Sequence, residues 1–248
     1  MLIASVRSKL SRTGARVRLI LTGIDSPSRN AKTGPMIQLF FLRSGVRPDV
    51  AQRLGADDAI CGTCPLRWAI AKLTNTVSCY VTVVQSVLST WKAHIGARVR
   101  FPAVLRRPVR LGAYGDPASA PVGILRSLVA LSGRWTGYTH QWKRAPELRT
   151  LCMASVDTPA QAADAWSRGW RTFRVRQVDD SGRPEPLLAG ESICPASHEY
   201  RATHPHKAPI QCYTCLLCDG ARTGREHVAN IAIIAHGSGV NADLTTTA

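Results

Sequence analysis

Short apolar segments alternate with helical segments over the second half of the chain, and this alternation constrains the fold more than any other feature. Strands are predicted at 109–114, 135–140, 151–156, 173–177, 187–193 and 231–235. Ser119 is a candidate N-cap for a helix through Leu131 that stops at Ser132 and Gly133. Strands alternating with helices favour a mostly parallel sheet that is covered on both faces.

The clearest helix boundaries lie between two of these strands. Thr158 fits an N-cap, Pro159 the first helical position and Gln161 the capping-box position, while Arg168 and Gly169 close the helix. A strand, a helix and a parallel strand form a unit with a right-handed crossover. We therefore predict an α/β fold, a partial or full parallel β/α barrel with a cysteine-rich metal-binding C-terminal segment. The sequence lacks the glycine-rich turns of open nucleotide-binding sheets.

Three regions are expected along the 248 residues. Residues 1–34 are basic and punctuated by Ser, Gly and Pro, which suggests a partly ordered arm. Residues 35–193 form the α/β domain, with a buried strand at 36–42 and a helix at 80–91. Residues 194–248 hold the second cysteine group, the last strand and a tail. Arginines interrupt the N-terminus and the apolar runs are short, so a cytoplasmic protein without a membrane segment is expected.

Seven of the eight cysteines fall into two groups. The first consists of Cys61, Cys64 and Cys79, and the second of Cys194, Cys212, Cys215 and Cys218. Cysteines at i and i+3 can direct two thiolates at one soft metal, and the Cys-x-x-Cys-x-x-Cys run is a spacing that iron–sulfur ligation favours. We interpret the groups as two metal sites, with 4Fe–4S clusters as the leading assignment.

Other interpretations of the cysteines stay open. Structural zinc is the main rival, especially at the four-cysteine group, and disulfides or unligated thiols are further alternatives. His94 is a conceivable fourth ligand of the first group, while His198, His204 and His206 could replace a thiolate in the second. Cys152 stands alone in an apolar stretch and is interpreted as a buried core residue.

The net charge of +16 makes nucleic acid the first partner class to consider. The charge concentrates in the basic arm, over Arg7–Lys32, and again over Arg98–Arg110, which contains five arginines and no acid. Phe101 is the sole aromatic residue in the second zone, whereas single-strand binders usually interleave several. A solvated basic surface without a specific partner is the alternative, and the sequence does not set an oligomeric state.

Polar side chains recur where the predicted strands end, which in parallel barrels is where active residues lie. Asp116 and His140 are the candidate catalytic residues, although Asp116 and Asp157 could instead cap the following segments. Gly112 and Gly115 shape a loop that allows close approach, and with Tyr114 and Ser155 they form the candidate cofactor-binding set. The same rule adds Gln141, Arg176, Gln177, Cys194 and His236.

Several stretches resemble an uncharacterised group of proteins carried by bacteriophages and plasmids of high-GC bacteria. This group is distantly similar to phage-encoded radical S-adenosylmethionine-like proteins, which use a three-cysteine cluster on an α/β barrel. The spacing here is Cys-x2-Cys-x14-Cys instead of the usual Cys-x3-Cys-x2-Cys. The matching segments are Cys61-Gly-Thr-Cys64-Pro-Leu with Cys79-Tyr-Val, Arg110-Leu-Gly-Ala-Tyr-Gly-Asp-Pro117, Trp135-Thr-Gly-Tyr-Thr-His-Gln-Trp142, Met153-Ala-Ser-Val-Asp157, Gly169-Trp-Arg-Thr-Phe-Arg-Val175 and Cys194-Pro-Ala-Ser197 with Cys-x-x-Cys-x-x-Cys.

Two functional hypotheses of different classes follow. The first is an iron–sulfur protein, in its sharper form a radical S-adenosylmethionine-like enzyme acting on nucleic acid or a nucleotide. The second is a non-enzymatic, zinc-stabilised nucleic-acid-binding protein. An electron-transfer protein with two closed clusters is a third interpretation.

Overall fold

The computed structural model of the chain describes residues 1–74, 79–221 and 229–235. One nine-stranded sheet forms its centre, with the strand order β1-β2-β3-β4-β5-β6-β7-β9-β8. The strands are β1 (Leu2–Arg7), β2 (Arg16–Thr22), β3 (Ile37–Arg43), β4 (Val109–Tyr114), β5 (Trp135–Thr139), β6 (Met153–Val156), β7 (Thr172–Arg176), β8 (Glu191–Ile193) and β9 (Asn230–Ile234).

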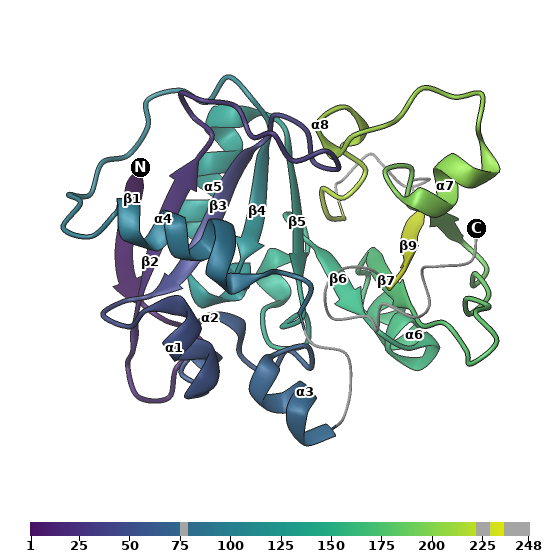
Figure 1. The fold of residues 1–248 in the computed structure, drawn as a ribbon, viewed down its shortest axis with the longest axis horizontal. Helices are drawn as coiled ribbons and strands as arrows, with labels where there is room; N and C mark the ends of the chain where they lie inside the picture. Colours follow the sequence, from purple (N-terminus) through teal and green to yellow (C-terminus); the bar gives the residue numbers. More distant parts are fainter. Residues whose placement is uncertain (75–78, 222–228, 236–248) are drawn as a thin grey trace.

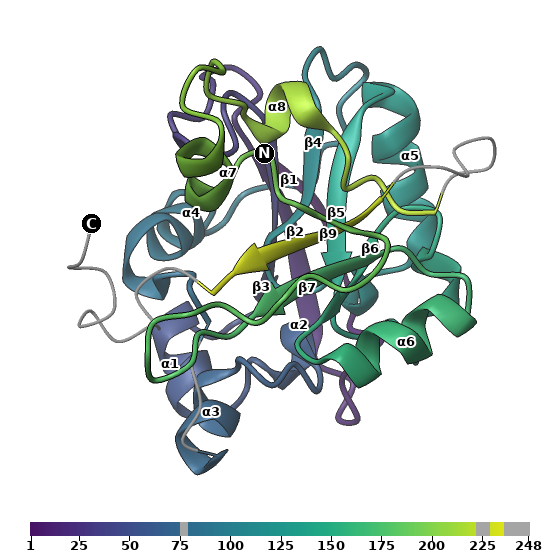
Figure 2. The same cartoon turned by 90° about the vertical axis from the view of Figure 1, so that its right-hand side faces the viewer.

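The first three strands pair antiparallel and all later pairs are parallel. The predicted α/β class is therefore confirmed. The hydrogen-bonded order runs from β1 at one edge to β8 at the other, with β9 inserted between β7 and β8. The sheet is strongly twisted, since β6, β7 and β9 run across the direction of β1–β5 in Figure 2.

Helices lie on both sides of the sheet, with α4 in front of it and α5 behind it in Figure 1. Buried leucines of α5 and buried alanines of α6 cover the face behind the sheet. The helices are α1 (Pro48–Arg53), α2 (Asp58–Cys61), α3 (Trp68–Thr74), α4 (Leu88–Ala93), α5 (Val122–Ser132), α6 (Pro159–Ser167), α7 (His198–Thr203) and α8 (Cys212–Cys215), with 3-10 turns at Pro117–Ser119 and Pro146–Leu148 and a π-helical turn at Val83–Val87.

The N-terminal region differs from the arm expected over residues 1–34. Strands β1 and β2 lie inside this region and form one edge of the sheet. Val17, Leu19 and Ile20 are fully buried, while Arg16 keeps its side chain outside. Apolar residues thus alternate with arginine at the start of β2, as in a strand with one buried face. The prediction of an arm was based on the arginines and did not consider this alternation.

Local capping explains where the helices begin. Thr158 Oγ1 accepts a hydrogen bond from Gln161 N at 3.2 Å, and Gln161 Oε1 accepts one from Asp157 N at 2.8 Å, which confirms the predicted cap of α6. The expected start at Ser119 is wrong, because α5 begins at Val122 after Pro121. The Ser119 hydroxyl instead donates to the Asp116 carbonyl at 2.7 Å and closes the 3-10 turn.

Candidate functional site

The two cysteine groups line one cavity of about 390 Å³. Alternate residues of the central strands supply its walls, because successive side chains of a strand point to opposite faces. The contributing side chains from the strands are those of Arg110 and Tyr114 on β4, Thr136 and Tyr138 on β5, Ser155 on β6, Phe173 and Val175 on β7, and Ile231 and Ile233 on β9. All seven cysteines predicted as ligands border this space.

The first cysteine group lies at the carboxyl ends of the parallel strands. Cys61 is the last residue of α2, and Cys64 Sγ lies 3.4 Å from Nδ1 of His140, the residue after β5. Gln141 Nε2 donates to the Cys61 carbonyl at 3.1 Å, which ties α2 to the end of β5. The first cysteine group therefore lies beside His140 and Gln141, two of the residues predicted at a strand end.

A buried arginine holds the loop that carries Cys61 and Cys64. Arg67 donates to Asp57 Oδ1 from Nε at 3.1 Å and from Nη2 at 2.6 Å. It also donates to the carbonyls of Gly62 at 3.0 Å and Gly55 at 2.7 Å. The two charged side chains are only 10% and 3% exposed. The guanidinium thus satisfies backbone groups that no regular structure pairs.

The second cysteine group lies near the amino end of β3. Cys212 N donates to the Lys32 carbonyl at 3.0 Å, and Tyr213 N donates to the Thr33 carbonyl at 3.1 Å. The Cys218 carbonyl accepts a hydrogen bond from Gly137 N of β5 at 2.9 Å. Residues far apart in sequence therefore surround this group. The segment before β3 lines the cavity beside it.

Arg171 holds the loop after Cys218 in the way Arg67 holds the first loop. It donates to the carbonyls of Leu217 at 2.8 Å and Gly220 at 2.9 Å, and to Asp219 Oδ1 at 3.2 Å. The exposed fractions of the two charged side chains are again 10% and 3%. Gly220 adopts φ +83°, and a Cβ there would lie 2.8 Å from the Arg149 carbonyl oxygen.

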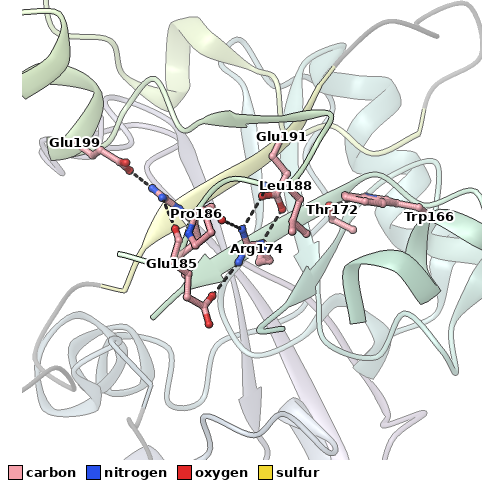
Figure 3. A network of polar contacts seen from close by, with 9 residues as sticks. Trp166, Thr172, Arg174, Glu185, Pro186, Leu188, Glu191 and Glu199 are labelled. Carbon is pink, nitrogen blue, oxygen red and sulfur yellow. Dashed lines mark hydrogen bonds and ion pairs between the residues drawn. The ribbon is translucent and has the colours of Figure 1, made fainter. Parts of the chain in front are cut away.

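Cys194 is positioned by an ion-pair network on β7, drawn in Figure 3. Arg174, whose side chain is fully buried, donates to Glu191 from Nε at 2.8 Å and from Nη2 at 2.7 Å, and to Glu185 at 2.9 Å. Arg176 pairs with Glu199 of α7. Because Cys194 lies between β8 and α7, the network fixes the chain on both sides of this cysteine.

Burial in the cavity disfavours the thiolate form of six of its cysteines. Burial raises the pKa of Cys194 to about 11. Burial likewise raises the pKa of each of Cys61, Cys64, Cys79, Cys215 and Cys218. All eight cysteines are free thiols, so the disulfide alternative finds no bridge here. Cys152 is fully buried in the core and away from the cavity lining, as predicted.

Asp116, a candidate catalytic residue, is buried between the strand ends and accepts several hydrogen bonds. Its Oδ1 accepts hydrogen bonds from Ala118 N at 2.9 Å and Thr139 Oγ1 at 2.7 Å, and its Oδ2 accepts one from His140 N at 2.9 Å. Burial raises the pKa of this carboxyl, and these three donors oppose the shift. The contacts are those of a residue that positions His140.

The imidazole ring of His140 lies near the side chains of Cys64 and Asp157. Its Nε2 lies 3.8 Å from Asp157 Oδ2, and within the described part of the chain this buried nitrogen has no hydrogen-bond partner. Asp157 Oδ1 is buried and unpartnered over the same residues. Burial raises the pKa of Asp157, with His140 opposing. Such unsatisfied polar atoms beside a cavity mark a place where a ligand or a proton can be received.

The candidate cofactor-binding residues Gly112, Tyr114, Gly115 and Ser155 all line the cavity. At the two glycines, the atoms that approach the backbone closely belong to the protein. A Cβ at Gly115 would lie 2.7 Å from Phe41 Cβ, and one at Gly112 would lie 2.9 Å from the Gly115 carbonyl oxygen. Both have positive φ, so the glycines serve packing of the strand end.

The other sequence candidates lie elsewhere. His94 Nε2 is 2.9 Å from the Met1 amine, so it is not beside the first cysteine group. His204 stacks on Tyr200, and none of the described histidines between Cys194 and Cys212 lines the cavity. Gln177 borders the cavity, whereas Arg176 is engaged by Glu199, and His236 lies outside the described residues.

The polar lining residues that were not predicted as site residues include Lys32, Tyr80, Arg110 and Tyr138. The strand prediction 109–114 could have found Arg110, since it shares the inward face with Gly112 and Tyr114. Of the five arginines in the zone Arg98–Arg110, three are exposed: Arg98, Arg100 and Arg106. Arg107 donates to the Ile24 carbonyl at 2.6 Å, and Arg110 turns into the cavity.

Comparisons with protein-family models, with curated proteins and with solved structures find no match. Over residues 1–74, 79–221 and 229–235, no three side chains among His, Cys, Asp and Glu converge closely enough to hold one metal ion. Among the helices that the structure describes, none is long and apolar enough to cross a bilayer.

Proposed function

We propose that this chain is an iron–sulfur protein in which both cysteine groups serve one cavity. The observation that carries the proposal is that seven thiols from distant segments border the same space. Soft sulfur ligands suit iron–sulfur clusters and zinc, and a positive metal centre would offset the mutual repulsion that thiolates there would suffer. The first group would hold one cluster through three thiolates, and the second another through four.

In the sharper form of the proposal the chain is a radical S-adenosylmethionine-like enzyme. A cluster with an open iron position supplies an electron to the molecule bound beside it. The residues of the chain then bind and orient that molecule. Cys64 Sγ lies 3.4 Å from His140, and Asp116 fixes the backbone of His140 at 2.9 Å. His140 and Asp157 present unpartnered atoms that can bind a polar group of a cofactor or substrate. The twisted sheet around the cavity would then act as a partial barrel.

Zinc-stabilised binding of nucleic acid is the second candidate function. The exposed side chains of Arg98, Arg100 and Arg106 favour it, because they lie on one irregular segment beside exposed Val99 and Phe101. Phosphate contacts by such arginines give an affinity that falls steeply with salt. Electrophoretic mobility shifts of single-stranded DNA at two salt concentrations test this candidate, and an affinity independent of salt contradicts it.

Metal and sulfide analysis separates the two candidates. Protein purified without oxygen is compared with Cys64→Ser, Cys215→Ser and, as the matched control, the core variant Cys152→Ser. About eight irons and eight sulfides, falling to about half in each of the first two variants and unchanged in the control, support two clusters. Colourless protein with one or two zincs rejects the iron–sulfur proposal.

A further inference from the structure

The cavity holds two cationic side chains between its cysteine groups. Arg110 on β4 and Lys32 before β3 both line the cavity. Lys32 lies next to the second cysteine group, since its carbonyl accepts a hydrogen bond from Cys212 N at 3.0 Å. A guanidinium inside a protein is costly unless acceptors or negative charge lie nearby.

The described residues supply Arg110 with a polar partner but no carboxylate. Its Nη2 donates to Tyr80 Oη at 2.8 Å, and its buried Nε has no hydrogen-bond partner among the residues that the structure describes. Over the same residues Arg110 makes no ion pair within 4.0 Å. Asp116 is the carboxylate among the described lining residues, and it is engaged by three other donors.

Apolar side chains of β7 and β9 form another part of the cavity lining. Phe173 and Val175 of β7 and Ile231 and Ile233 of β9 border the cavity, and Tyr138 packs edge-on against Phe173 with ring centroids 4.7 Å apart. A pocket of this kind buries the body of a small molecule in apolar surroundings and fixes its orientation through a few polar groups. A guanidinium supplies two parallel donors that match a carboxylate or a phosphate.

We propose that Arg110, together with Lys32 of the same cavity, binds the anionic head of a small ligand whose planar apolar body lies against Phe173 and the side chains of β9. The head is a phosphate or a carboxylate. The inference rests on the cavity being the working site proposed above, but it does not depend on which metal the cysteines hold. It assigns to this site a ligand class, small amphipathic anions.

Calorimetric titration of the purified full chain with phenyl phosphate, benzoate and neutral benzyl alcohol tests the assignment. At least one anion binds at least tenfold more tightly than benzyl alcohol, and the stronger of the two identifies the head group. Arg110→Gln weakens that binding at least tenfold, while Arg126→Gln, at an exposed position of α5, leaves it unchanged. Equal binding of all three probes, or undiminished binding in Arg110→Gln, overturns the inference.

If Arg110→Gln does not fold, Lys32→Met is tested in its place and should bind the anion at least threefold more weakly. An unchanged affinity of that variant overturns the inference.

Metal content of each sample separates this inference from the proposed function. Loss of metal from Arg110→Gln would identify the arginine as a counter-charge for thiolates and overturn the assignment. Metal-free wild-type protein that still binds the anions keeps the site and rejects the iron–sulfur proposal. Metal-containing protein that does not bind the anions rejects the site and keeps the iron–sulfur proposal.

Discussion

Replacement of Arg67 by methionine tests whether the loop of the first cysteine group depends on one buried cation. The substitution keeps a long apolar stem but removes the contacts to Asp57 and to the carbonyls of Gly55 and Gly62. Asp57 is left as a nearly buried charge without its partner, which costs about 3–5 kcal/mol. The free energy of unfolding of a domain is about 5–15 kcal/mol, so the loss takes a large share of it.

Urea unfolding followed by circular dichroism measures this loss. The matched control is Arg53→Met, because Arg53 also pairs with an aspartate, Asp49, at 3.3 Å, but its side chain is 61% exposed. An exposed pair contributes less than about 1 kcal/mol, so the control variant should unfold close to the wild type. A loss below about 1 kcal/mol in Arg67→Met, or equal losses in the two variants, would refute the reasoning.

Two further variants probe the backbone and the pH dependence. Gly220→Ala should lower the free energy of unfolding by more than about 2 kcal/mol, since positive φ costs about 1–2 kcal/mol and the new Cβ meets backbone atoms at 2.8 Å. Gly133→Ala, also at positive φ but with nothing within 4 Å, should lose only the conformational part in the same urea assay. The hydrogen bonds from Arg47 lower the pKa of Asp49 to about 2, so its stabilisation is complete above its ordinary pKa of 3.8 and is lost as the pH falls through about 2. Asp49→Asn should therefore flatten the acid side of the curve of melting temperature against pH, and an unchanged curve contradicts this.

The part of the fold that could be predicted is the part set by local sequence. The strand predicted at 109–114 matches β4, and the Thr158 cap matches α6, because alternation and capping act within a few residues. The missed strand β1 shows the limit of that reasoning. Its pairing with β2 buries Leu2 and Ile3 in a region where arginines dominate the composition, and only tertiary contacts decide this.

The two cysteine groups of the candidate site could be recognised in the sequence, but their arrangement in space could not. Cysteine spacing indicated two groups, but only the folded chain shows that Cys64 and Cys218 border one space. Residues such as Arg171 carry no motif, because their role is to satisfy carbonyls of a loop that is remote in sequence. Lys32 likewise reaches the site through the backbone contact of its carbonyl with Cys212 N.

The place of β9 in the sheet sets an order for the assembly of the second cysteine group during synthesis. Strand β8, which leads directly into Cys194, pairs with β9 at the edge of the sheet, and β9 follows β8 in the chain. On the ribosome the first cysteine group, held between β3 and β5, has all its neighbours before β9 emerges. The second group, in contrast, acquires its final geometry only after the last strand has paired with β7 and β8.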